Sequence, residues 1–87
     1  MTTNIKFERM TMSGYNTIIV TRDGDPVGAM EADMVKLIRL LFKVEKAKIT
    51  ECSLTIRWDR DADELQIYAS DEFKAVMTRG EFERLAN

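Results

Sequence analysis

Residues 53–70 read SLTIRWDRDADELQIYAS, and they predict a β-hairpin. Apolar and polar residues alternate in 53–58 and again in 64–70, which is the periodicity of strands with one buried face. A four-residue turn at 60–63 places apolar residues opposite one another, and a slip of one residue would destroy that agreement. The sequence therefore predicts the register too, with the pairs Trp58–Leu65, Ile56–Ile67 and Leu54–Ala69.

A second hairpin is predicted upstream. Residues 17–22 are almost all β-branched, and Asp23 and Gly24 follow them. This dipeptide favours a two-residue turn in which both positions have positive φ, so the next strand is predicted at 25–30. The expected pairs are Arg22–Asp25, Thr21–Pro26, Val20–Val27 and Ile18–Ala29. Alternation in 4–10 predicts one more strand.

Residues 31–46 show helical periodicity and predict a long helix. Their apolar residues spread over an arc wider than a helix packed on one sheet needs. Because the chain has one cysteine and so no internal disulfide, this extra apolar surface predicts self-association. The residues expected to mediate it are Leu40, Leu41 and Val44. The cations of the same helix are expected on one basic stripe, formed by Lys36, Arg39, Lys43 and Lys46.

The C-terminal part predicts a last strand and a short helix. The strand is expected at 73–77, and Thr78 and Glu81 have the spacing of a capping box before a helix at 81–85. Residues 1–87 are thus predicted to form a single α+β domain. Its expected order is β-β-β-α-β-β-β-α, an antiparallel sheet of two three-stranded meanders with one long helix and one short C-terminal helix.

The residue inventory argues against an enzyme. The chain has no histidine and a single cysteine, Cys52, so it lacks the commonest general base and the usual ligands of zinc. Its four glycines are scattered and form no phosphate-binding loop. Residues 59–64 open like a calcium loop, but Glu64 occupies the position that requires glycine. We expect no catalytic site, no cofactor and no metal.

Composition and charge predict a soluble cytoplasmic protein. The chain is 45% hydrophobic and 32% charged, which is typical of a globular domain. No apolar run approaches the roughly 20 residues of a membrane helix, and the start lacks the pattern of a secretory signal. We therefore expect no membrane contact. The net charge of −2 is too small to indicate a nucleic-acid partner.

The function that these features favour is a small protein–protein interaction module. We expect a homodimeric regulator or inhibitor of a larger machine, of the kind encoded by phages and mobile elements, with nucleic-acid-handling machines among its candidate targets. Its docking face is expected on the 53–70 hairpin, where Arg57 faces Gln66 and the turn is acidic. The residues are Arg57, Gln66, Tyr68, Asp59, Asp61, Asp63 and Glu64. The alternative is nucleic-acid binding through the basic stripe.

Overall fold

The structure, a computed structural model, describes residues 4–51 and 54–87. Seven strands and two helices follow one another in these ranges. They are β1 (Ile5–Met12), β2 (Tyr15–Arg22), β3 (Asp25–Glu31), α1 (Met34–Leu41), β4 (Lys46–Glu51), β5 (Leu54–Asp59), β6 (Glu64–Ala69), β7 (Glu72–Met77) and α2 (Arg79–Ala86). The α+β class is therefore confirmed. Neither helix is long and apolar enough to cross a membrane.

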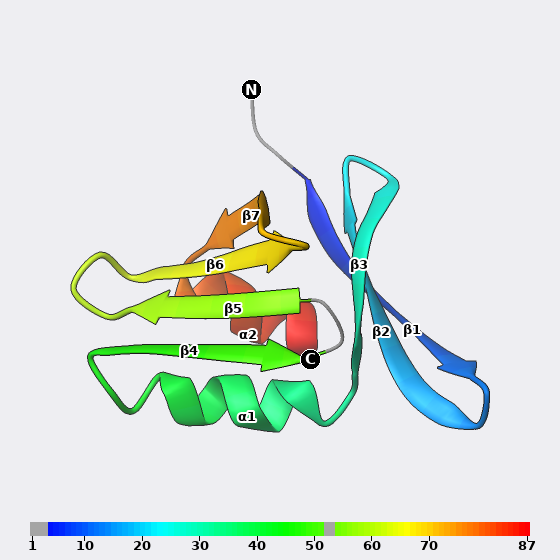
Figure 1. Cartoon of the computed structure of the whole chain (residues 1–87), viewed down its shortest axis with the longest axis horizontal. Coiled ribbons are helices and arrows are strands. Elements are labelled where there is room, and N and C mark those ends of the chain that lie inside the picture. The colour runs from blue at the N-terminus through cyan, green and yellow to red at the C-terminus, as the bar shows by residue number, and fades with distance from the viewer. Residues whose placement is uncertain (1–3, 52–53) are drawn as a thin grey trace.

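The strands form two antiparallel sheets rather than one (Figure 1). The first has the order β1-β2-β3, and the second has the order β4-β5-β6-β7. Each strand pairs with its neighbour in the chain, as predicted for meanders. The prediction of two three-stranded meanders is wrong for the second, because β4 adds a fourth strand to it. In Figure 1, α2 lies behind the second sheet and α1 runs beside β4.

The predicted long helix is wrong, because α1 ends at Leu41. Tertiary contacts just beyond it explain the change of structure. The Trp58 indole donates a hydrogen bond to the Val44 carbonyl at 3.1 Å, and its ring packs against Phe42 with 4.6 Å between the ring centroids. These contacts hold the chain after the helix against β5. Lys46 then pairs with Asp59 at the start of β4.

The register of the β5–β6 hairpin is confirmed, with the turn at 60–63. In the β2–β3 hairpin the two pairs next to the turn are confirmed, but a bulge at Val27 shifts the rest. Val20 therefore lies opposite Gly28, and Ile18 lies opposite Met30. The extra residue turns Met30 into the core and brings Gly28 against the second sheet. An ideal Cβ added to Gly28 would lie 2.5 Å from Leu54 Cδ2, so a larger residue at this position would force Leu54 or the strands to shift.

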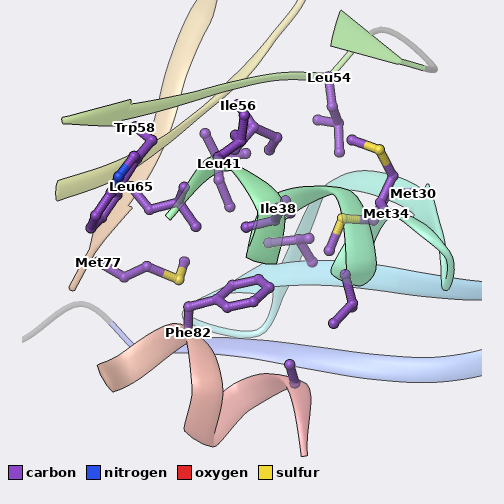
Figure 2. Packing of buried hydrophobic residues seen from close by; sticks show 14 of the residues in the cluster. Met30, Met34, Ile38, Leu41, Leu54, Ile56, Trp58, Leu65, Met77 and Phe82 are labelled. Carbon is purple, nitrogen blue, oxygen red and sulfur yellow. The ribbon is translucent and has the colours of Figure 1, made fainter. Parts of the chain in front are cut away.

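One hydrophobic core joins both sheets and both helices (Figure 2). Phe82 of α2 is fully buried and makes edge-on aromatic contacts with Phe7 and Phe42, with centroids 5.8 and 5.5 Å apart. Trp58, which we expected on the apolar face, is buried as well. One face of α2, which carries Phe82 and Ala86, thus packs into the core.

The capping box that starts α2 is confirmed. The Thr78 hydroxyl accepts a hydrogen bond from the Glu81 amide at 3.1 Å, and the Glu81 carboxylate accepts one from the Thr78 amide at 3.0 Å. These two bonds satisfy backbone donors that a helix start leaves free. The helix begins at Arg79, two residues before the predicted start.

Candidate functional site

The outer face of the second sheet is the candidate site. Leu54, Ile56 and Trp58 point into the core, so the alternate residues of β5 point outward. The register aligns the outward residues of four strands in three cross-strand rows. The rows are Lys46–Asp59–Glu64, Lys48–Arg57–Gln66–Val76 and Thr50–Thr55–Tyr68–Phe73. We call these eleven residues the open face, since each is exposed or half-buried and none belongs to the core.

A connected set of side chains crosses the open face. The Arg57 guanidinium lies over the Tyr68 ring, with 5.5 Å from Cζ to the centroid, and the Phe73 ring meets Tyr68 edge-on at 5.7 Å. The Tyr68 hydroxyl donates to Gln66 Oε1 at 3.1 Å, and Gln66 donates in turn to Glu64 at 3.2 Å. We call Arg57, Gln66, Tyr68 and Phe73 the aromatic strip. Their mutual contacts hold these side chains in place before any partner binds.

Cations from β4 and β5 lie beside the aromatic strip. Lys46, Lys48 and Arg57 line a shallow depression of about 450 Å³ on the open face, together with Asp59 and Glu64. Lys46 approaches Asp59 at 3.9 Å. Lys48 and Arg57 are directly opposite one another across the strands, and neither forms an ion pair with a described residue.

A fourth cation near this face is already paired. Lys74 of β7 donates a hydrogen bond to Glu72 at 2.7 Å. This bond and the charge of Lys74 hold the pKa of the Glu72 carboxyl below its usual value. Because Lys74 is engaged by Glu72, it is less available to a ligand than Lys48 or Arg57.

The acidic turn is largely occupied with its own structure. Asp59 Oδ1 accepts hydrogen bonds from the backbone amides of Asp61 and Ala62 at 3.1 and 3.4 Å. Asp63 Oδ1 accepts one from the Arg79 amide at 3.0 Å, which ties the turn to the start of α2. Glu64 accepts a hydrogen bond from the Gln66 side chain. Of the four predicted acidic residues, Asp61 is thus the one whose carboxylate accepts no hydrogen bond among the described contacts. The turn is therefore a weaker docking element than the sequence indicated.

The predicted self-association surface is smaller than expected. Leu41 is 9% exposed and packs in the core, so it cannot mediate contacts between copies. Leu40 and Val44 are 55% and 45% exposed. Because α1 has only eight residues, these side chains form a short apolar patch rather than the surface of a long helix.

The predicted basic stripe does not exist as one helix face. Lys36 and Arg39 lie on α1, but Lys43 follows the helix and Lys46 begins β4. Arg39 is also engaged, since its guanidinium donates to the Glu83 carboxylate at 3.1 to 3.3 Å. The early end of α1 is the physical reason why Lys43 and Lys46 lie off the helix.

Sequence reasoning found the Arg57, Gln66 and Tyr68 part of the site, and the structure brings these three together. It missed Lys48 because β4 was assigned to the helix and the connection after it. The alternation of Ala47 and Ile49 with polar neighbours in Lys46–Glu51 was the available signal. It also missed Phe73 and Val76, which also belong to this face.

Two further features of the described residues bear on the site, their capacity to bind a metal and their other depressions. No group of three or more His, Cys, Asp or Glu residues in 4–51 and 54–87 could hold a metal ion. The depression near Arg9, Met10 and Asn16 is smaller than the one on the open face, at about 380 Å³. Comparisons with protein-family models, with curated proteins and with solved structures found no match to this chain, so its own residues carry the functional argument.

Proposed function

We propose that this protein is a non-enzymatic binding module that docks a partner protein on the open face. The observation that carries the proposal is the aromatic strip, an ordered Arg–Tyr–Phe cluster on a sheet face that no described element covers. Tyrosine and arginine are enriched among the residues that dominate binding energy in protein interfaces. A module of this kind acts as a regulator or inhibitor by occupying a surface of its partner.

The order of the aromatic strip supports tight binding. A side chain that is already fixed loses little conformational entropy when a partner arrives. Tyr68 is fixed from three sides, by Arg57, Gln66 and Phe73. Phe73 and Val76, which are 51% and 47% exposed, add apolar area at the edge of the strip. The open face thus combines apolar anchors with oriented hydrogen-bonding groups, as interface centres do.

The proposal does not include the homodimer or the nucleic-acid binding that the sequence led us to expect. A homodimer through α1 loses support, because Leu41 is buried and the remaining patch is short. Stable interfaces bury roughly 800 Å² on each partner, far more than two or three aliphatic side chains supply. Nucleic-acid binding along α1 has less support, because Lys43 and Lys46 are not on the helix.

The first prediction tests the open face by substitution. The partner is isolated by affinity capture from the native cell and purified, and its Kd for the wild-type chain is measured by calorimetry. The double variant Tyr68→Ala/Phe73→Ala is expected to weaken the Kd by about 30-fold or more, because it removes two anchors of the interface. Tyr15→Ala is the matched control, since Tyr15 is 64% exposed on β2, outside the open face. If the double variant kept the wild-type Kd and Tyr15→Ala bound the partner more weakly, the interface would lie on the first sheet instead.

A further inference from the structure

We infer that the partner segment seated on the open face is acidic and places a carboxylate between Lys48 and Arg57. This inference rests on the proposed function and adds the chemistry of the partner. Its starting observation is that two cations face one another on neighbouring strands and form no ion pair with a carboxylate of the described residues. Like charges directly opposite in a sheet repel one another, so a binding anion relieves a repulsion that is already present.

The other cations around the open face show that this pair is distinctive. Lys46 has Asp59 at 3.9 Å, and Lys74 has Glu72 at 2.7 Å. Across the row from Arg57, β6 supplies Gln66, whose side chain is neutral and bonded to Tyr68 and Glu64. Among the described residues, Lys46 and Lys74 thus have carboxylate partners, whereas Lys48 and Arg57, in the middle row of this face on β4 and β5, have none.

The geometry of Arg57 suits a carboxylate. Its guanidinium lies over the Tyr68 ring, which holds the planar group in one orientation. A guanidinium held in this way can bind both oxygens of a carboxylate through two parallel N–H donors. The depression that Lys48 and Arg57 line provides room for the incoming side chain. Phe73 and Val76 lie on neighbouring positions of the same face, so an apolar residue close to the acidic one completes the match.

A protein fits this face better than a nucleic acid does. A nucleic-acid backbone brings a series of phosphates and is bound by several cations that follow it. Here the two unpaired cations stand in one row, and the carboxylates of Asp59 and Glu64 line the same depression. A single acidic side chain next to an apolar residue matches this arrangement, whereas a run of phosphates would meet those carboxylates.

The test is selection of random peptides about 12 residues long, displayed on phage, against the full chain. We expect the selected peptides to be enriched in Asp or Glu beside an aromatic or aliphatic residue. The variant Lys48→Glu/Arg57→Glu should bind a selected synthetic peptide at least about tenfold more weakly, and it should select Lys or Arg instead. The variant Lys36→Glu/Lys43→Glu is the matched control, because it makes the same charge change at exposed positions outside the open face. It should bind the peptide like the wild type.

The outcomes separate this inference from the proposed function. If no selected peptide depends on Tyr68 and Phe73, the open face is not a protein-binding surface and both fail. If peptides depend on Tyr68 and Phe73 but show no acidic enrichment, or bind the reversed variant equally well, the inference alone fails. A third outcome would assign the cations to nucleic acid and overturn the inference. In that outcome no acidic peptides are selected, and the wild type binds an oligothymidine of about 20 nucleotides at ~50 mM salt, whereas Lys48→Glu/Arg57→Glu does not.

Discussion

Replacing Phe82 by alanine is expected to lower the free energy of unfolding by about 3 to 5 kcal/mol. Phe82 is fully buried and joins Phe7 of the first sheet to Phe42 at the end of α1. The substitution removes the aromatic contacts and leaves a cavity that the surrounding elements cannot fill without moving. A domain of this length has a total stability of only about 4 to 13 kcal/mol, so the loss is a large fraction of the total.

Urea denaturation followed by the fluorescence of Trp58, the only tryptophan, measures this effect. Phe73→Ala is the control, because Phe73 is a half-exposed residue of the same type. Its cost should stay below about 1 kcal/mol. Equal midpoints for Phe82→Ala and the wild type would show that α2 does not pack in the core. A large loss for Phe73→Ala would show that the open face is covered within the molecule.

Replacing Gly28 by alanine is expected to destabilise the protein by about 1 to 3 kcal/mol. The added Cβ would lie 2.5 Å from Leu54 Cδ2 and 3.3 Å from its Cγ. Leu54 is itself buried, so its side chain has little room to rotate away. The two sheets would separate locally, or Leu54 would adopt a strained conformation. Denaturation midpoints report the loss.

Gly80→Ala is the matched substitution for comparison. Gly80 lies in α2, and a Cβ there would meet nothing closer than 3.9 Å, so alanine should be neutral or stabilise by up to about 1 kcal/mol. In a Leu54→Ala background, Gly28→Ala should cost less, because the opposing side chain is gone. The same cost in both backgrounds would mean that the two residues are not in contact and that the sheets pack differently.

The sequence predicted the strand pairing next to the turns of the hairpins. It did not predict the parts of the register that depend on tertiary packing. Alternation in the two arms of the β5–β6 hairpin sufficed for its register, because a slip would have buried polar residues. The bulge at Val27 could not be predicted in this way. Both registers of β3 place apolar residues inward, so alternation does not distinguish them, and in the observed one Gly28 lies against Leu54 of the other sheet.

The end of α1 shows the same limit. Helical periodicity continues through Val44, and no glycine or proline follows Leu41 to stop the helix. In the structure the helix ends there, and Trp58, far along the chain, donates a hydrogen bond to the Val44 carbonyl just beyond it. This one difference explains the missed strand β4, the divided basic stripe and the absence of Lys48 from the predicted site.

Part of the candidate site could be predicted from the sequence, because the register of a hairpin determines which side chains lie next to one another. Once Arg57 faces Gln66, the position of Tyr68 one row away follows from the strand geometry. The contribution of Phe73 did not follow, because the irregular register between β6 and β7 brings it opposite Tyr68. The roles of Asp59 and Asp63 also depended on hydrogen bonds with backbone amides, which composition does not reveal.

Site-specific photo-crosslinking tests the claim of an open docking face most directly. Benzoylphenylalanine replaces Phe73 on the open face in one variant and Tyr15 on β2 in the other, and both are irradiated with the partner in the native cell. Because both side chains are aromatic and exposed, the comparison isolates their position. We predict a covalent partner adduct from position 73 and none from position 15. An adduct from position 15 alone would contradict the account and place the partner on the first sheet.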